Sequence, residues 1–144
     1  MSDTSSRNPM AAPQLFADAL LRSVAGTTAL LRVTGVNTET TQLEVGLVAT
    51  TFYDVVVSPV VMRKLRPTWK ESREIKWELL VSATSVEAQV HALDLSSAQA
   101  LFDLTLSVTV SGKEYLIESI ASNEAFGTVY LYRLLIRETH AQSL

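Results

Sequence analysis

The sequence contains no cysteine, so disulfides, thiolate metal sites and cysteine nucleophiles are excluded. Its five glycines stand singly and form no glycine-rich loop of the Walker or Rossmann type. No apolar run approaches the roughly 20 residues that cross a bilayer, and the N-terminus lacks the basic-then-apolar layout of a signal peptide. We therefore expect a soluble protein with no membrane partner, and the lack of cysteine fits a reducing cytosol.

Residue patterns for catalysis and metal binding are missing as well. His91 and Asp94 have the spacing of a ligand pair on a helix, but two ligands do not make a metal site. His140 lies in a predicted C-terminal tail, where a catalytic triad would lack a fixed geometry. Ser111 is followed by Gly112, but the flanking glycine and the following helix of a nucleophile elbow are absent. We predict that the protein is not an enzyme and that it takes no cofactor.

Apolar residues are what the chain has in quantity. They make up 47% of the sequence, against 19% charged residues, which is apolar for a small monomer. A small sheet domain cannot bury all of this surface, and the excess indicates contact with other subunits. The length of 144 residues predicts a single domain. We place this domain at residues 13–138, with flexible tails at 1–12 and 139–144.

The net charge of −3 hides a segregation of charge along the chain. Residues 63–76 hold six of the twelve basic residues and two acidic ones, a local charge of +4, which leaves −7 for the remainder. Two interpretations stay open for the predicted long loop at residues 66–74. It either contacts nucleic acid or a neighbouring subunit, with an indole as a stacking surface, or it is a solvated loop with internal ion pairs. The candidate contact residues are Arg63, Lys64, Arg66, Trp69, Lys70, Arg73 and Lys76.

The N-terminal part predicts one short helix at residues 13–25. Pro13 suits the first turn of a helix, and Gly26 suits a left-handed position that ends one. Apolar residues recur at helical spacing and predict one apolar face, which either covers the core or contacts another subunit. These residues are Leu15, Phe16, Ala19, Leu20 and Val24.

Strand patterns follow at residues 27–34, 42–50, 52–57 and 75–83, where β-branched residues or alternating apolar residues are frequent. Pro59 cannot donate to a sheet ladder, so it marks a strand end, an edge or a bulge. At residues 84–103 the pattern changes to short helices. Thr84 and Ser96 both begin a capping-box pattern, although residues 86–92 also alternate as a strand would.

The C-terminal part predicts a hairpin, a connection and a long closing strand. Ser111-Gly112 is the signal of a two-residue hairpin loop, since that length keeps the apolar residues of both arms on one face. Residues 123–127 form the next connection, and residues 128–137 form a strand that is apolar on both faces. Such a strand is either central in a sandwich or half inside a subunit interface. The candidate interface residues are Val129, Tyr130, Leu131, Tyr132, Arg133, Leu135 and Arg137.

The predicted fold is therefore mainly β. We expect a small antiparallel β-barrel or sandwich of about seven strands. An N-terminal helix precedes it, and one or two short helices come before the C-terminal hairpin.

Several terminal motifs resemble a known family. A short apolar helix, LFADALLRSVAG, runs into the strand TTALLRVTG, and the hairpin has the form V-x-V-x-G-K-x-Y-x-I-x-S-I, followed by GTVYLYRLLIR. In this order the motifs resemble the head-completion proteins of long-tailed bacteriophages, which are also called stopper or head–tail joining proteins. The matching pieces, residues 16–34, 108–120 and 127–137, cover somewhat under half of the chain. Residues 60–103 are longer than is typical of the family.

The resemblance implies a structural protein of the virion neck that is made in the host cytoplasm. Subunits of this family form a homo-oligomeric ring at the head–tail junction, with portal and adaptor proteins on the head side and tail proteins on the other. The ring closes the DNA channel, and residues 66–74 correspond by position to a loop that enters the channel or clasps a neighbour. Two alternatives remain: a tail terminator or other neck or tail ring, and a small β-barrel that binds nucleic acid non-specifically.

Overall fold

A computed structural model describes residues 12–24, 26–35, 51–65 and 75–139. Several predictions lie outside these residues: the strand at 42–50, the loop at 66–74 and, apart from residues 12 and 139, both terminal tails. Everything that follows about the arrangement of the chain concerns the described residues.

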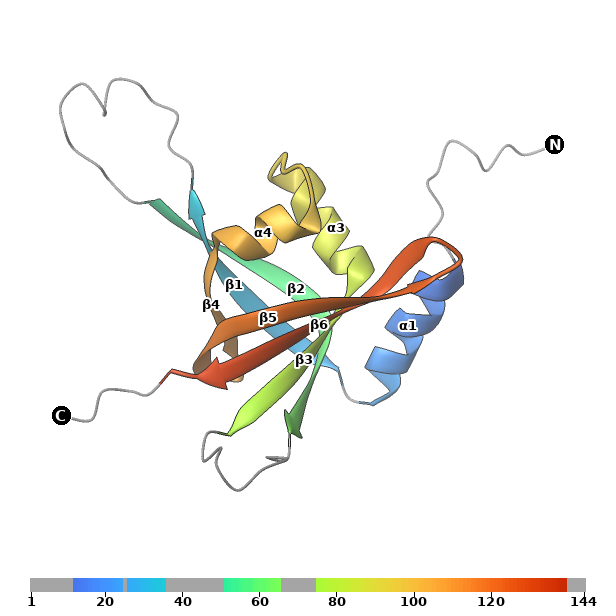
Figure 1. Ribbon diagram of the computed structural model, residues 1–144, viewed down its shortest axis with the longest axis horizontal. Helices are drawn as coiled ribbons and strands as arrows, with labels where there is room; N and C mark the ends of the chain where they lie inside the picture. Colours follow the sequence, from blue (N-terminus) through green and yellow to red (C-terminus); the bar gives the residue numbers. More distant parts are fainter. Residues whose placement is uncertain (1–11, 25, 36–50, 66–74, 140–144) are drawn as a thin grey trace.

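Six antiparallel strands close into a barrel, in the order β1-β2-β3-β6-β5-β4 (Figure 1). The bounds are β1 Thr27–Gly35, β2 Thr51–Leu65, β3 Lys76–Ser82, β4 Thr105–Val110, β5 Lys113–Ala125 and β6 Thr128–Glu138. The prediction of a mainly β fold is confirmed, and of the two architectures it is the barrel. The described residues contain six strands where about seven were predicted, and the prediction at 42–50 accounts for the difference.

Alternation along the strands builds the core. Successive side chains of a strand point to opposite faces, and the residues that point into the barrel are almost all aliphatic. The largest apolar side chains of the strands that are completely enclosed are Leu31, Val57, Val60, Leu79, Val81, Val108, Leu134 and Ile136. Strands β1, β2, β3, β4 and β6 all contribute, so the barrel interior is a packed core.

Strand β2 continues through Pro59. Val57 pairs with Ala29, whereas Val60 pairs with Thr27, so β2 has one more residue than β1 over this stretch. The pairing therefore contains a β-bulge at Pro59. Proline has no N–H to donate, and it is tolerated at a bulge because the regular hydrogen-bond ladder is interrupted there. Of the three alternatives for Pro59 the bulge is confirmed, and the strand end is wrong.

Among the described residues, three helices accompany the barrel: α1 Ala12–Ser23, α3 Ala83–Ala92 and α4 Ala98–Leu104. Helices α3 and α4 pack against one side of it (Figure 1) and add Val86, Leu101 and Phe102 to the core. The two short helices predicted between residues 84 and 103 are therefore confirmed, and the strand alternative for residues 86–92 is wrong.

The caps of these helices differ from the predicted ones. The Ser82 hydroxyl accepts the N–H of Ser85 at the start of α3, two residues before the predicted cap. The Ser97 hydroxyl accepts the N–H of Ala100 at the start of α4, one residue after it. Each actual cap is a serine within two residues of the predicted one. The capping-box pattern therefore located the start of each helix closely but chose the wrong residue as its cap.

Gly26 also differs from its prediction, because it is not among the glycines with a positive φ. Its N–H donates to the carbonyl of Leu21 at 2.9 Å. A Cβ at this position would lie 2.5 Å from the same oxygen, so glycine is required by the close approach of the backbone.

The two C-terminal hairpins have loops of two residues. Ser111-Gly112 joins β4 to β5 as predicted. The predicted connection at residues 123–127 is too long, because β5 continues to Ala125 and only Phe126-Gly127 forms the turn. Asn123 and Glu124 are poor strand formers, but both pair with β6. As a result the β5–β6 hairpin is long and its tip reaches α1 (Figure 1).

Candidate assembly surface

The predicted basic segment is divided by the structure. Arg66, Trp69, Lys70 and Arg73 lie outside the described residues, whereas Arg63 and Lys64 lie near the end of β2 and Lys76 begins β3. Arg63 forms an ion pair with Glu78, which is its Cα partner across β2 and β3. The Lys76 ammonium lies 3.0 Å from a carboxylate oxygen of Glu118 on β5.

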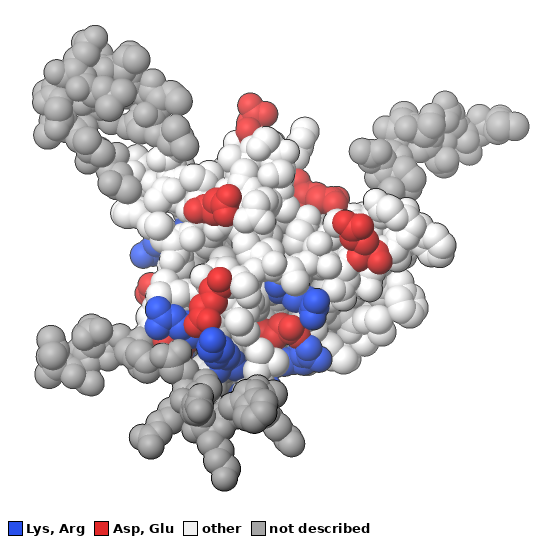
Figure 2. All heavy atoms as spheres, in the orientation of Figure 1, with Lys and Arg blue, Asp and Glu red and all other residues white. Residues whose placement is uncertain are grey.

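The same two carboxylates also hold the arginines of β6. Arg133 Nη1 lies 3.7 Å from Glu78 Oε2, and Arg137 Nε lies 3.3 Å from Glu118 Oε1. The outer surface of β2, β3, β6 and β5 therefore carries interleaved charges in which four cations share two carboxylates. Figure 2 shows Lys and Arg gathered at the end of the molecule where β3 begins and β6 ends, while Asp and Glu predominate toward α3 and α4.

Strand β6 pairs with β3 on one edge and with β5 on the other within a closed barrel, so the alternative of a central strand in a sandwich is wrong. Leu134 and Ile136 of β6 are buried in the core, and Tyr132 packs edge-on against Phe102 with ring centroids 5.5 Å apart. The outward residues Arg133 and Arg137 are engaged in the ion pairs. The outer face of β6 is therefore less apolar than the sequence indicated, and its role as an interface stays a prediction.

Carboxylates near Tyr132 affect its ionisation. Burial raises the pKa of the Tyr132 phenol above its ordinary value, and the negative charges of Glu87 and Glu124 raise it further. Glu87 lies on α3 and contacts Gln14 of α1, and Glu124 lies near the end of β5. This part of the surface is acidic.

Helix α1 lies on the barrel with its apolar face turned outward. The side that faces the barrel is at least nine-tenths buried and carries Gln14, Ala17, Asp18 and Leu21. The opposite side and one flank carry Leu15, Phe16, Leu20 and Val24, each more than half exposed. The alternative that this face covers the core is wrong, and the alternative of a subunit contact remains.

Hydrogen bonds explain the orientation of α1. The Gln14 amide donates to both oxygens of Glu87, at 3.1 and 3.2 Å, and to the carbonyl oxygen of Val129 at 3.1 Å. The Ser82 hydroxyl donates to Asp18 Oδ1 at 2.6 Å. Buried polar groups need such partners, and turning α1 by half a rotation would take Gln14 and Asp18 away from them.

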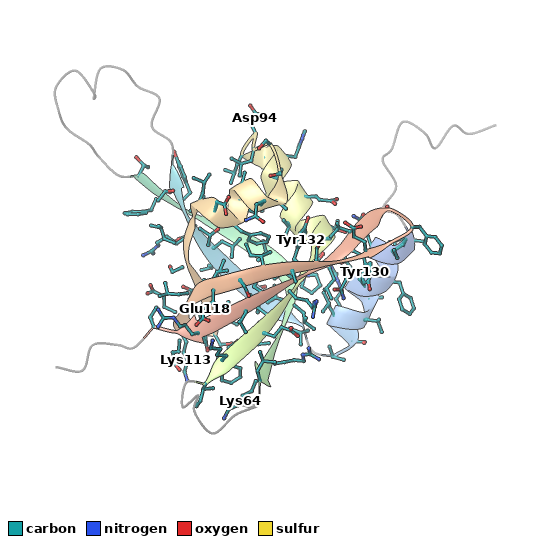
Figure 3. All side chains as sticks on the ribbon, viewed as in Figure 1. Lys64, Asp94, Lys113, Glu118, Tyr130 and Tyr132 are labelled. Carbon is teal, nitrogen blue, oxygen red and sulfur yellow. The ribbon has the colours of Figure 1, made fainter. Side chains whose placement is uncertain are left out.

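An apolar groove lies between α1 and the β5–β6 hairpin. It has a volume of about 750 Å³. Its lining is Ala12, Pro13, Phe16, Ala17, Leu20, Leu21, Val24, Leu80, Ala125, Phe126, Tyr130 and Leu131. Two of the predicted interface residues, Tyr130 and Leu131, are therefore brought together with the outward face of α1. Figure 3 shows Tyr130 on β6 beside α1.

Phe126 stands at the edge of this groove with 99% of its surface exposed. Its φ is +53° and that of Gly127 is +74°, which is the backbone pattern of a type I′ turn. Asn, Asp and Gly are favoured there, because a left-handed backbone costs other residues about 1–2 kcal/mol. A large aromatic that is both strained and fully exposed indicates a functional constraint on this turn.

Phe126 was not predicted as a site residue, because the sequence pattern placed it in a longer connection. The Phe-Gly pair between two strand patterns was the available signal. The inward position of Gln14 and Asp18 was not predicted either, although their spacing of four residues placed them together on one helix face.

The described residues contain no group of three or more His, Asp or Glu residues placed to hold a metal ion. No helix among them is long and apolar enough to cross a membrane.

Comparisons with known proteins returned no match: no family model fits the sequence, and neither curated proteins nor solved structures resemble it significantly.

Proposed function

We propose that this protein is a structural subunit that assembles with copies of itself into a ring at the head–tail junction of a long-tailed bacteriophage. The observation that carries the proposal is the outward apolar face of α1, continuous with the groove and with Phe126. Contiguous exposed apolar surface of this kind marks an interaction site. The terminal motifs that resemble head-completion proteins support the location.

The proposed ring closes the channel through which packaged DNA leaves the head and presents a docking surface to the tail. Portal and adaptor proteins are its partners on the head side, and tail proteins on the other. The charge distribution supports this role, because an acidic body does not hold DNA tightly while the basic end can contact phosphate or an acidic neighbour.

A nucleic-acid-binding module is less well supported. Among the described basic residues, Arg63, Lys76, Arg133 and Arg137 all have carboxylate partners. Binding phosphates through these side chains would compete with existing ion pairs, which lowers the electrostatic gain from neutralising each phosphate.

Electron microscopy tests the proposal in two steps. Purified protein should give closed rings in class averages, and an antibody against the chain should label the head–tail junction of virions from infected cells. Label at the end of the tail would instead identify a tail terminator. A strict monomer that is absent from particles would overturn the proposal.

A further inference from the structure

Strand β5 has a partner along the whole of one edge but along only a short part of the other. It pairs with β6 as far as Ala125, whereas it pairs with β4 only from Lys113 to Tyr115. Residues 116–125, which we call the β5 arm, therefore have one edge that no strand of the described residues covers. Every second residue of an antiparallel strand directs its backbone N–H and C=O to a given edge. This edge thus presents a row of donors and acceptors without a strand partner.

The space beside the β5 arm is open where the described residues border it. A polar pocket of about 410 Å³ separates residues 117–120 from α4, whose side of the pocket carries Gln99 and Asp103. Helix α4 therefore does not seal the edge. Further along the arm, Ser122 and Glu124 are exposed.

Backbone hydrogen bonds and side chains together define what can occupy this edge. An exposed strand edge is a template for another strand, and an added strand is held by main-chain hydrogen bonds and selected by its alternate side chains. A bulge at Glu118 puts Ile117 and Ile120 on the same face of β5. Both are partly buried and pack against the core. The best occupant is therefore an extended segment that is apolar on one face.

The chain contains one segment with this pattern that is not among the six described strands. Residues 42–50 lie outside the described residues, and their sequence predicts a strand. Leu43, Val45 and Leu47 share one face, and Gln42 and Glu44 share the other.

The place where this segment joins the barrel favours a second copy as its acceptor. Residue 50 is followed by Thr51, which begins β2 and pairs with Gly35, the last residue of β1. In Figure 1 β2 begins at the left, whereas the β5 arm runs to the right toward α1. A strand that precedes Thr51 in line with β2 therefore leads away from the β5 arm of its own copy.

We infer that residues 42–50 of one copy add a strand to the β5 arm of a second copy. The inference rests on the proposed function, since it names a contact through which the subunits of the ring meet. The donated segment and the accepting edge are different surfaces, so each copy donates to one neighbour and accepts from another. Contacts of this heterologous kind generate a closed ring when the rotation between copies closes.

Cross-linking tests the contact directly, because the chain has no cysteine of its own. Facing Cα atoms of neighbouring antiparallel strands are about 4.5–5.5 Å apart, a separation that a disulfide spans. Three full-length double variants combine Ser122→Cys with Leu43→Cys, Val45→Cys or Leu47→Cys, which covers different registers of the two strands. In the controls Lys113→Cys replaces Ser122→Cys, because Lys113 is exposed but its edge is already paired with β4.

Non-reducing electrophoresis after mild oxidation measures the linkage. At least one of the Ser122→Cys double variants should give a ladder of covalently joined copies that the controls lack. A monomer with an internal disulfide would overturn the inference, since the segment would then occupy the arm of its own copy. An assembled protein that gives no ladder in any double variant would overturn it while the proposed ring stands. A wild-type protein that is monomeric would overturn the proposed function as well.

A substitution in the backbone of the arm gives an independent measurement. Ala125 and Thr128 flank a two-residue loop and so bond to each other, and by alternation Ser122 directs its N–H to the free edge. Ser122→Pro removes this donor, whereas Ser122→Ala keeps it and is the matched control.

Circular dichroism verifies that both variants fold, and native mass spectrometry on dilution measures their assembly. Ser122→Pro should raise the concentration at which the ring dissociates about tenfold, the effect of one lost hydrogen bond at each contact. Ser122→Ala should leave it unchanged. A folded Ser122→Pro variant that assembles like the wild type would overturn the inference.

Discussion

At Phe126 a large apolar side chain and a left-handed backbone occur together at the tip of the β5–β6 hairpin. Each is unfavourable for an isolated subunit, since the side chain is fully exposed and the φ of +53° suits Asn far better than Phe. Both features become understandable if the ring of Phe126 is covered by another subunit. Stability of the monomer and stability of the assembly should then respond in opposite directions to substitution.

Replacing Phe126 by Asn tests this opposition. Phe126→Asn should raise the free energy of unfolding of the dilute monomer by about 1 kcal/mol, because Asn tolerates the left-handed backbone, and should weaken assembly. Chemical denaturation and native mass spectrometry measure the two effects. Phe126→Leu is the matched control, which keeps an apolar side chain and the strain and should change monomer stability little. A less stable Asn variant would contradict a strained turn.

Tyr132 provides a prediction about pH. Its pKa is raised in the folded protein, first by burial and then by Glu87 and Glu124. The unfolded chain therefore loses its phenolic proton at lower pH than the folded protein, near the ordinary value of about 10.

As pH rises above that value, the unfolded state binds fewer protons than the folded state, and the free energy of unfolding should fall. Below it, Tyr132 should contribute no slope. Tyr132→Phe should make the decline shallower in denaturation curves taken at alkaline pH. Part of the slope should remain, since burial also raises the pKa of Tyr115. An unchanged slope in Tyr132→Phe would contradict the assignment.

Among the helices and strands, α1 shows most clearly which features follow from local sequence and which depend on distant residues. Its apolar periodicity correctly predicted a helix, but not which side faces the barrel. Gln14 and Asp18 are held by residues 73 and 64 positions away, namely Glu87 and Ser82. No pattern within the helix contains these partners, so its orientation could not be read from the helix alone.

Two adjacent leucines of α1 give a direct test of its orientation. Leu20→Glu should change the free energy of unfolding by less than about 0.5 kcal/mol, because Leu20 is exposed. Leu21→Glu makes the same change one residue further on, where the side chain is only 5% exposed. It should cost about 3–5 kcal/mol, since it buries an unpaired charge. Thermal or chemical denaturation of both variants decides, and a reversed order would show that α1 is turned the other way.

Other elements were largely predictable. The Ser111-Gly112 loop followed from the parity of the two strands. The helices α3 and α4 followed from the capping-box patterns at Thr84 and Ser96, although the actual caps are Ser82 and Ser97. The charge network was not predictable, because the pairing of Arg63 with Glu78 depends on the register between β2 and β3. Of the candidate assembly surface, the sequence indicated Tyr130, Leu131 and the apolar face of α1. Their meeting in one groove required the long β5–β6 hairpin.

Over the whole molecule, several of the large exposed apolar side chains gather in the groove between α1 and the β5–β6 hairpin, while basic and acidic side chains gather on different parts of the surface (Figure 2). An exposed apolar surface of this kind is suited to contact with another subunit. The composition of 47% hydrophobic residues is explained if the working form is an assembly.

Native mass spectrometry of the purified full-length protein over a range of micromolar concentrations measures whether this chain assembles with itself. A ring-forming subunit should give one closed oligomer with a single number of subunits, greater than two, and no series of open chains. A protein that remains monomeric at every concentration would rule out the ring.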